Sequence, residues 1–315
     1  GGSGLSTEST GNTMKKCTES DKGVDAPKRK MPARVLVTGA AGQLGSDVLS
    51  ALRERGIDGI GADITEFDIT DADAAISFIG KCAPTTVIHC AAYTAVDRAE
   101  DEPELCALIN VTGTENVARA CRAVNASMIY ISTDYVFPGE GESFYETDDP
   151  TGPQNVYGRT KRMGEEAVLK ILDRSFIVRI SWVFGKNGAN FVRTMLRLGN
   201  ERPEISVVGD QFGSPTYTRD LSVLLCEMAL SDRYGIYHAT NEGVCSWAGF
   251  ARAIMEKAGL ACVVKAISSA EYPVKARRPK NSRLSKKSLT GNGFSLLPHW
   301  EDALERYLKE LRTDG

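Results

Sequence analysis

The sequence predicts an α/β fold with a Rossmann-type, doubly wound parallel sheet and a smaller C-terminal domain. Two observations support this fold class. Short apolar runs alternate with helical segments from Ala33 onward, which is typical of a parallel sheet covered by helices on both faces. A glycine-rich turn, TGAAGQLG, joins the first apolar run to the first helical segment, and this placement gives such a turn its significance.

The elements follow from short apolar runs bounded by turn residues, which indicate buried strands. We expect five strands at residues 34–39, 57–63, 85–92, 127–133 and 175–181. Helical spacing between them predicts helices at residues 46–56, 71–82, 103–125 and 155–172. Pro103 favours the start of the third helix, and Gly56 favours the end of the first. A later helix at 218–230 and a strand at 235–239 return to the sheet.

Domain boundaries follow from a loosening of this rhythm after Trp182. We assign residues 31–181 and 215–240 to a dinucleotide-binding Rossmann domain. Residues 182–214 and 241–315 are expected to form a smaller, mainly helical substrate-binding domain. Residues 1–30 are rich in Gly, Ser and Thr and end in a basic cluster. We interpret them as a flexible leader or a cloning remnant.

Composition excludes several classes of protein. The chain has 315 residues, a net charge of −3 and 25% charged residues, whereas a nucleic-acid binder usually carries a basic face. It contains no apolar run near the roughly 18 residues that a membrane span needs. The eight cysteines are scattered without a C-x-x-C pair, which favours reduced thiols. We therefore expect a cytoplasmic protein that binds neither nucleic acid nor membranes.

The glycine turn predicts a dinucleotide site. Gly39 permits the tight turn, Gly42 lets the backbone approach a pyrophosphate, and Gly45 permits close packing of helix and strand. Gln43 and Leu44 lie between the last two glycines, where the helix N-terminus offers free N–H groups to phosphates. Asp63 closes the second strand and is placed to bind a ribose 2′-hydroxyl, which favours NAD. The turn after this strand could be placed differently, so the choice between NADH and NADPH stays open.

Tyr157 and Lys161 are predicted to be an acid–base pair. A spacing of four residues puts both on one helix face. A phenol has a pKa near 10, and we expect the nearby ammonium to lower it. Tyr157 would then be a general acid for a developing alkoxide. Ser132 and Thr133 end the fourth strand, where ligands bind in parallel sheets, and a hydroxyl there can bind a carbonyl oxygen.

These motifs carry a family resemblance. The order TGAAGQLG, STDYVF, YGRTK resembles the extended short-chain dehydrogenase/reductases. Further blocks are similar to the dTDP-4-dehydrorhamnose reductase family from Met31 to the C-terminus; they are CAAYTAVDRAE, ISTDYVFPG, PQNVYGRTKRMGE, RISWVFGKNGANFVRTML, SVVGDQFGSPTYTRDL and RRPKNSRLS.

The resemblance implies NADPH- or NADH-dependent reduction of the C4 keto group of a dTDP-4-dehydro-6-deoxy-L-sugar, giving dTDP-L-rhamnose. Thr133 then positions the keto oxygen, Tyr157 protonates it and Lys161 binds the cofactor ribose. The implied sugar contacts are Asp134, Tyr135 and Trp182, and the implied diphosphate contacts are Asn190 and Arg278. The implied cofactor contacts are Asp68 and Ile69 on the adenine side, with Ala91, Ala92, Tyr93 and Asn110.

Two features depart from the pattern or leave it open. Ser285 stands where the family commonly has an acid, which puts details of the last loop in doubt. Some members bind Mg²⁺ at a dimer interface, and Asp47 lies where one ligand would be. We interpret Asp47 as a surface carboxylate and predict no metal. The resemblance is compatible with a monomer or a homodimer.

Two other functions are compatible with the same motifs. One is another sugar-nucleotide epimerase or reductase of the superfamily, and an epimerase would retain its cofactor through purification. The other is a non-catalytic regulatory subunit resembling that of methionine adenosyltransferase, because a binding protein can retain inherited site residues.

Overall fold

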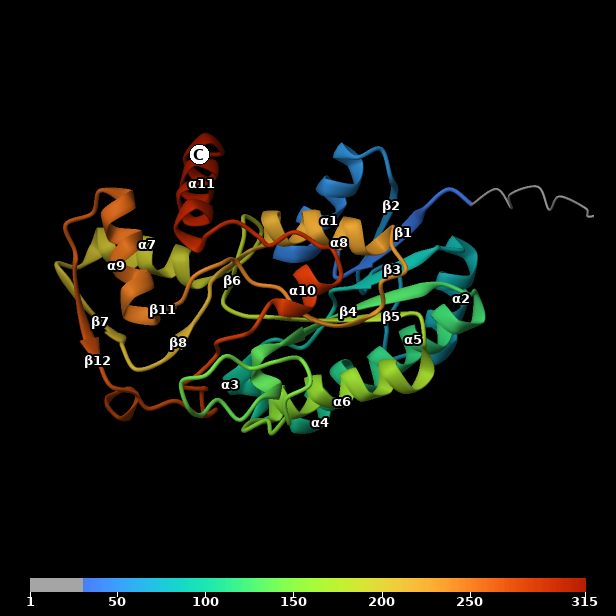
Figure 1. Ribbon diagram of the computed structural model, residues 1–315, viewed down its shortest axis with the longest axis horizontal. Helices are drawn as coiled ribbons and strands as arrows, with labels where there is room; N and C mark the ends of the chain where they lie inside the picture. Colours follow the sequence, from blue (N-terminus) through green and yellow to red (C-terminus); the bar gives the residue numbers. More distant parts are fainter. Residues whose placement is uncertain (1–30) are drawn as a thin grey trace, which may run out of the picture. The chain divides into compact units, whose positions relative to one another are not determined.

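The computed structural model describes residues 31–315, so the predicted leader lies outside the described residues. Its centre is a six-stranded, all-parallel sheet in the order β10-β5-β4-β3-β1-β2 (Figure 1). These strands are β1 (Arg34–Thr38), β2 (Asp58–Ala62), β3 (Thr86–His89), β4 (Ser127–Thr133), β5 (Ser175–Ile180) and β10 (Gly235–His238). The predicted fold class is confirmed.

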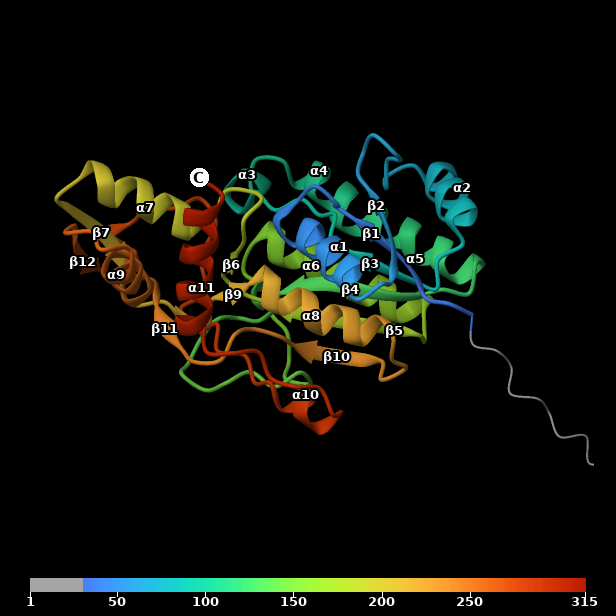
Figure 2. The ribbon, with the colours of Figure 1, turned by 90° about the horizontal axis from the view of Figure 1, so that it is seen from above.

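Helices cover both faces of this sheet (Figures 1 and 2). One layer holds α1 (Gln43–Glu54) and α8 (Thr218–Ala229), which pack against each other. The other layer holds α2 (Ala72–Cys82), α5 (Thr114–Ala123) and α6 (Val156–Ile171). Every residue of β3, β4 and β5 is buried. Strands covered on both faces read as continuous apolar runs rather than alternating ones, which explains why they could be recognised in the sequence.

The chain reverses its direction of travel across the sheet between β1 and β3. From β1 it crosses to β2 at the edge, and it then returns to β3 on the opposite side of β1. The crevice beyond the carboxyl ends of strands at such a point is where open α/β sheets bind ligands. The topology therefore places the loops after β1, β3 and β4 around one crevice.

The predicted helix 103–125 is interrupted. It consists of α4 (Pro103–Ala107), a π-helical segment η1 (Leu108–Gly113) and α5. Asn110 lies in the π-helical segment, and its side chain bonds both the backbone N–H and the carbonyl of Tyr93. A π-helical turn inside a long helix is invisible to helical periodicity, because it adds only one residue to a turn.

Besides its helices, the smaller region contains short strands that the sequence did not predict. Two parallel pairs and one antiparallel pair form here: β7 (Glu204–Val208) with β12 (Val263–Ile267), β6 (Val183–Phe184) with β9 (Thr216–Tyr217), and β8 (Phe212–Gly213) with β11 (Cys245–Ser246). Each strand is at most five residues long and finds its partner far along the chain. Such pairing is not encoded in local periodicity.

Helices complete this region around a core of its own, which includes Phe184, Phe250, Trp300 and Tyr307. The longer ones are α7 (Phe191–Glu201), α9 (Trp247–Ala258) and α11 (Trp300–Thr313). The short elements elsewhere are α3 (Val96–Ala99), η2 (Asp134–Val136), η3 (Ser269–Glu271) and α10 (Lys287–Gly291). The exact domain boundaries given above stay a prediction.

Candidate active site

The glycine-rich turn between β1 and α1 has the steric demands that the sequence predicts. Gly39 has φ +64°, and a Cβ there would lie 2.8 Å from the backbone nitrogen of Ala91. A Cβ on Gly45 would lie 2.1 Å from the carbonyl oxygen of Gly39. Both contacts are too short for any side chain, and a positive φ favours glycine. The turn therefore brings α1 against β1 and beside the loop that follows β3.

The N-terminus of α1 is free to bind an anion. Its N-cap residue is Gly42, no side chain caps it, and its first turn holds no acidic residue. The first N–H groups of a helix have no partner within the helix, and the helix dipole adds positive potential there. Such a terminus fits a phosphate group.

Asp63 follows β2 and faces this turn. Its Oδ2 accepts a hydrogen bond from the Ala41 N–H at 3.0 Å. The carboxylate thus fixes the glycine-rich turn while it lines the cavity described below. Its predicted contact with a ribose hydroxyl stays a prediction.

The end of β4 carries a small polar network. The Thr133 hydroxyl donates to Asp134 Oδ1 at 3.0 Å and accepts from the Tyr135 N–H at 3.2 Å. The Ser282 hydroxyl donates to Asp134 Oδ2 at 2.5 Å. Burial raises the pKa of Asp134 to about 6, although the two hydroxyls oppose this increase. A carboxyl that titrates near neutral pH therefore lies directly beside Thr133.

Tyr157 lies in the first turn of α6, and tight packing presses this turn against the end of β4. The Asn155 side chain caps α6 by accepting from the Gly158 N–H at 2.7 Å. A Cβ on Gly158 would lie 2.4 Å from the carbonyl oxygen of Tyr135. The Tyr157 ring meets the Tyr135 ring edge-on, with centroids 5.6 Å apart. The sequence thus folds Tyr157 next to Thr133 and Tyr135.

The predicted lowering of the Tyr157 pKa was wrong for this structure. Burial raises the pKa, the Asp134 carboxylate adds to the increase, and the Thr133 hydroxyl opposes it. The Lys161 ammonium instead donates from Nζ to the Ile131 carbonyl at 2.6 Å. The phenol is consequently protonated at neutral pH, which is the form that a proton donor requires.

Lys161 is a buried cation at the end of β4. Its Nζ also lies 4.4 Å from the centroid of the Tyr130 ring. Burial lowers the pKa of Lys161 to about 8, and the Glu165 carboxylate opposes this decrease. One of the three ammonium protons is used by Ile131, so two donors remain for a ligand.

These groups line one large cavity with a volume of about 1270 Å³. It lies where the sheet topology predicts a ligand site, beyond the carboxyl ends of β1, β3 and β4. Trp182 forms part of the wall, with φ +51° and its ring stacked on Trp247 at a centroid distance of 3.7 Å. The predicted site residues that line the cavity are Gly39, Gly42, Gln43, Leu44, Gly45, Asp63, Asp68, Ile69, Ala91, Ala92, Thr133, Asp134, Tyr135, Tyr157, Lys161 and Trp182.

Four predicted contact residues do not line this cavity: Tyr93, Asn110, Asn190 and Arg278. The first two bind each other through the Asn110 amide, as described above. Asn190 caps α7 and also donates to Gln43 Oε1 at 3.1 Å, so it supports a residue that does line the cavity. Arg278 forms a bidentate ion pair with Asp97 at 3.0 Å. Their contacts with ligands stay predictions.

Comparison with known proteins gives the family. The family model described as "RmlD substrate binding domain" matches residues 33–313. The chain is 42% identical to dTDP-4-dehydrorhamnose reductase of Streptomyces griseus, over 86% of this chain and 91% of that protein. It is 41% identical to spore coat polysaccharide biosynthesis protein SpsK of Bacillus subtilis, over 88% of this chain and 97% of that protein.

A solved structure agrees with both. The crystal structure of dTDP-4-dehydrorhamnose reductase from Bacillus anthracis in complex with NADP has a TM-score of 0.87 and 44% identity, covering 89% of this chain and all of that chain. The chain belongs to the dTDP-4-dehydrorhamnose reductase family. The resemblance drawn from its motifs is therefore confirmed.

Within this family framework, sequence reasoning missed some of the cavity wall. Trp247 begins α9, far from the glycine turn, and no local motif marks it. Asn187, Gly188 and Ala189 line the cavity from the loop before α7. Their spacing resembles an ordinary surface loop, so only the fold reveals them.

The other features of the family resemblance are placed as follows. Asp47 accepts a hydrogen bond from the Thr218 hydroxyl at 2.6 Å. Residues 31–315 contain no group of three or more His, Cys, Asp or Glu side chains that could hold a metal ion. Within the same residues, no helix combines the length and the apolar character that a membrane crossing needs. Ser285 is buried, and its carbonyl lies 3.0 Å from His238 Nδ1.

Proposed function

We propose that this protein catalyses the NADPH- or NADH-dependent reduction of the C4 keto group of dTDP-4-dehydro-6-deoxy-L-mannose to dTDP-L-rhamnose. One observation carries the proposal: the glycine turn and the Thr133, Tyr157 and Lys161 side chains line a single cavity. Its volume of about 1270 Å³ exceeds the roughly 300–1,000 Å³ of ordinary small-molecule pockets, as a site for two nucleotides requires. The names of the relatives and the NADP complex of the Bacillus anthracis protein support it.

The residues around the glycine turn fit a dinucleotide. The turn leaves no room for a Cβ at Gly39 or Gly45, and the uncapped N-terminus of α1 suits the pyrophosphate. Asp63, Asp68 and Ile69 would hold the adenosine end, and the loop after β3 would hold the nicotinamide end. When bound, the reduced nicotinamide supplies the hydride.

The chain's own residues supply the proton. Tyr157 keeps its proton at neutral pH because burial raises its pKa, and its Oη donates this proton to the C4 oxygen. Thr133 orients that oxygen, which requires its hydroxyl to turn from Asp134 toward the substrate. Lys161 has a pKa of about 8 and is mostly charged at neutral pH. Its two remaining N–H donors would bind the ribose hydroxyls of the cofactor.

The aromatic wall offers a surface for the sugar. Trp182 lines the cavity, and its ring stacks on the ring of Trp247, which also lines it, at an interplanar angle of 14°. A left-handed backbone at a non-glycine residue is strained and persists only where its surroundings fix it. We assign Trp182, Asp134 and Tyr135 to contacts with the deoxysugar. Arg278 would have to break its ion pair with Asp97 before it could bind the diphosphate.

The direct test is nicotinamide oxidation followed by absorbance. The purified protein is mixed with NADPH or NADH and with dTDP-4-dehydro-6-deoxy-L-mannose, formed in situ from dTDP-glucose by the two preceding enzymes. Stoichiometric loss of reduced cofactor with formation of dTDP-L-rhamnose is expected. Dinucleotide binding without oxidation by either cofactor would instead favour an epimerase, another sugar nucleotide or a regulatory subunit.

A further inference from the structure

A buried ion pair lies directly behind the proposed catalytic residues and has no role in the mechanism above. Glu165 of α6 is 0% exposed and Arg179 of β5 is 2% exposed. Arg179 donates from its terminal NH2 group to Glu165 Oε1 at 2.8 Å and from Nε to Oε2 at 3.0 Å. A bidentate pair of this kind is strong and geometrically specific, yet burying two charges is costly. Stability alone therefore does not explain why these two charges are buried together.

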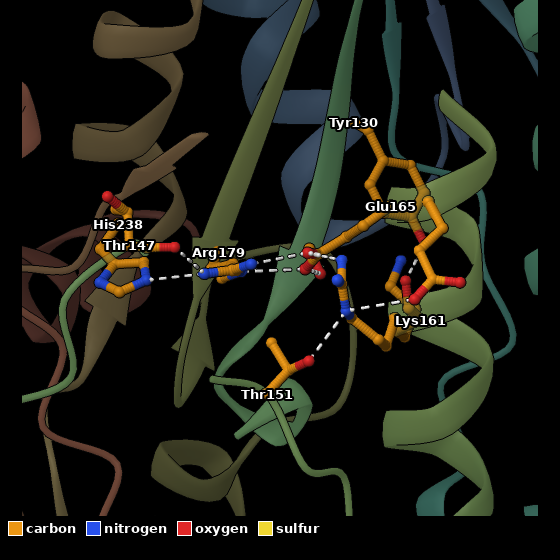
Figure 3. A network of polar contacts seen from close by, with 10 residues as sticks. Tyr130, Thr147, Thr151, Lys161, Glu165, Arg179 and His238 are labelled. Carbon is orange, nitrogen blue, oxygen red and sulfur yellow. Dashed lines mark hydrogen bonds and ion pairs between the residues drawn. The ribbon is translucent and has the colours of Figure 1, made fainter. Parts of the chain in front are cut away.

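Both members are fully engaged with their surroundings (Figure 3). Glu165 also accepts from the Ser132 hydroxyl at 2.5 Å. Arg179 reaches the Thr147 carbonyl at 3.1 Å and His238 Nε2 at 3.3 Å on its other side. The pair thus connects α6 with three neighbouring strands, β4, β5 and β10.

The same face of α6 carries the proposed catalytic residues. Tyr157, Lys161 and Glu165 follow each other at intervals of four residues, so their side chains lie one turn apart on one face. On β4, consecutive residues receive them: the Ile131 carbonyl accepts from Lys161 and the Ser132 hydroxyl donates to Glu165. Thr133 is the next residue along the strand. Each bond of this register helps to fix Tyr157 relative to Thr133.

Close packing between α6 and β4 supports this register. A Cβ on Gly164 would lie 2.2 Å from the Tyr130 hydroxyl, and that hydroxyl donates to the Lys161 carbonyl at 3.1 Å. The helix consequently lies so close to the strand that only glycine fits at position 164. Charges buried among protein atoms, as those of Lys161, Glu165 and Arg179 are, interact more strongly than in bulk solvent.

The groups around Lys161 leave the ion pair as the main source of charge. Burial keeps the thiols of Cys90 and Cys106 and the phenol of Tyr130 protonated, because it raises the pKa of each. Burial also keeps His89 neutral, with a pKa of about 3. The charged groups that face this region are Glu165 and Arg162 from α6, Arg179 from β5 and Asp134 from the end of β4.

We propose that Glu165 and Arg179 are positioning residues that set the charge state of Lys161. The Glu165 carboxylate favours the charged ammonium of Lys161, and Arg179 weakens this effect because it neutralises part of the carboxylate's charge. The catalytic meaning of this arrangement rests on the proposed function. The electrostatic arrangement itself depends only on the buried groups.

The proposal predicts shifts of opposite sign. Glu165→Gln leaves Arg179 and Lys161 as two buried cations, so the pKa of Lys161 should fall by about one unit or more, as Coulomb's law gives for charges roughly one helical turn apart. Arg179→Gln removes the buried cation that pairs with both carboxylate oxygens and leaves only the partly exposed Arg162, at 3.3 Å. The pKa of Lys161 should therefore rise, by less than the fall expected for Glu165→Gln. The double variant should return it close to that of the unmodified protein. A merely structural pair would instead destabilise in both single variants without opposite shifts.

The experiment measures this pKa directly, by NMR titration of protein labelled with ¹³C at lysine Cε. The Lys161 signal is identified by its loss in Lys161→Met. Glu166→Gln is the matched control: its carboxylate is the next one along α6 but its side chain is 60% exposed, so solvent should screen it and leave the pKa of Lys161 unchanged. Shifts in the same direction in both single variants, or no shift in either, would overturn the proposal.

Two further comparisons keep the result decisive. Glu165→Asp keeps the negative charge, so it should destabilise the fold less than Glu165→Gln, which leaves Arg179 without its carboxylate partner. This variant should preserve the pKa of Lys161. A shift as large as that expected for Glu165→Gln would overturn the proposal. The alkaline limb of nicotinamide oxidation should follow the measured pKa in every folded variant. If the NMR shifts occur in a protein without reductase activity, the proposed function fails while the inference stands. If activity is present but the pKa does not respond, the inference alone fails.

Discussion

Asp134 should make the stability of this protein depend on pH in a way that one substitution removes. Its side chain is buried beside Thr133, and burial raises its pKa from 3.8 to about 6. Because folding raises this pKa, the protonated carboxyl is the form that the folded state prefers. The contribution of Asp134 to stability is therefore complete below about pH 4 and is lost as the pH rises through 6.

The magnitude follows from the shift. A change of about two pKa units corresponds to about 3 kcal/mol, since each unit is worth 1.36 kcal/mol. Asp134→Asn cannot ionise and so lacks this dependence. Relative to Asp134→Asn, the unmodified protein should lose about 3 kcal/mol in free energy of unfolding between pH 4 and pH 7.5.

The assay is urea denaturation of both proteins at half-unit steps between pH 4 and pH 8. The slope of the free energy against urea should be equal in the two proteins, which shows that the same surface is exposed on unfolding. Altered hydrogen bonding of the amide adds a constant offset, so only the pH-dependent part of the difference counts. Asp148→Asn, at an exposed position, is the control and should show no comparable trend. A difference between Asp134→Asn and the unmodified protein that stays constant across this range would refute the reasoning.

Three predictions concern the site itself. Tyr157→Phe should lower kcat by about 10² or more, the usual scale for loss of a general acid, with the dinucleotide Kd nearly unchanged; near-normal turnover would contradict the assignment. Lys161→Met should both lower kcat and raise the cofactor KM, and a change in only one of these parameters would show that the dual role is wrong. Gly45→Ala should abolish measurable NADPH binding by fluorescence titration, because its Cβ would lie 2.1 Å from the Gly39 carbonyl oxygen. Gly80→Ala, with open space around the new Cβ, should bind normally and melt slightly higher, as expected for an exposed helix position; equal behaviour of the two alanine variants would argue against the turn as the binding site.

Local features account for the parts of the site that the sequence predicted. The glycine turn can be recognised in the sequence because only glycine tolerates the φ of Gly39 and the close approach at Gly45. Tyr157 and Lys161 share a helix face because helical geometry alone puts them there. Strands that helices cover on both faces can be recognised as continuous apolar runs in the sequence. In each case the physical constraint acts within a few residues of chain.

The remaining parts depend on neighbours that are distant in sequence. Arg179 stands in the apolar run SFIVRIS, and only the folded chain shows that Glu165 compensates its charge. Trp247 could not be assigned to the cavity before the fold placed it on Trp182. The pairing of β7 with β12 joins two short segments whose local patterns are weak.

The shift of the Tyr157 pKa separates what local sequence determines from what the tertiary structure decides. The sequence by itself determined that a phenol and an ammonium share one face of a helix beyond a dinucleotide-binding turn, because helix periodicity and glycine sterics are local. Only the tertiary structure decided that the ammonium of Lys161 bonds the Ile131 carbonyl and that burial raises the phenol pKa. Desolvation depends on everything that surrounds a group in space, and no local stretch of sequence contains that information.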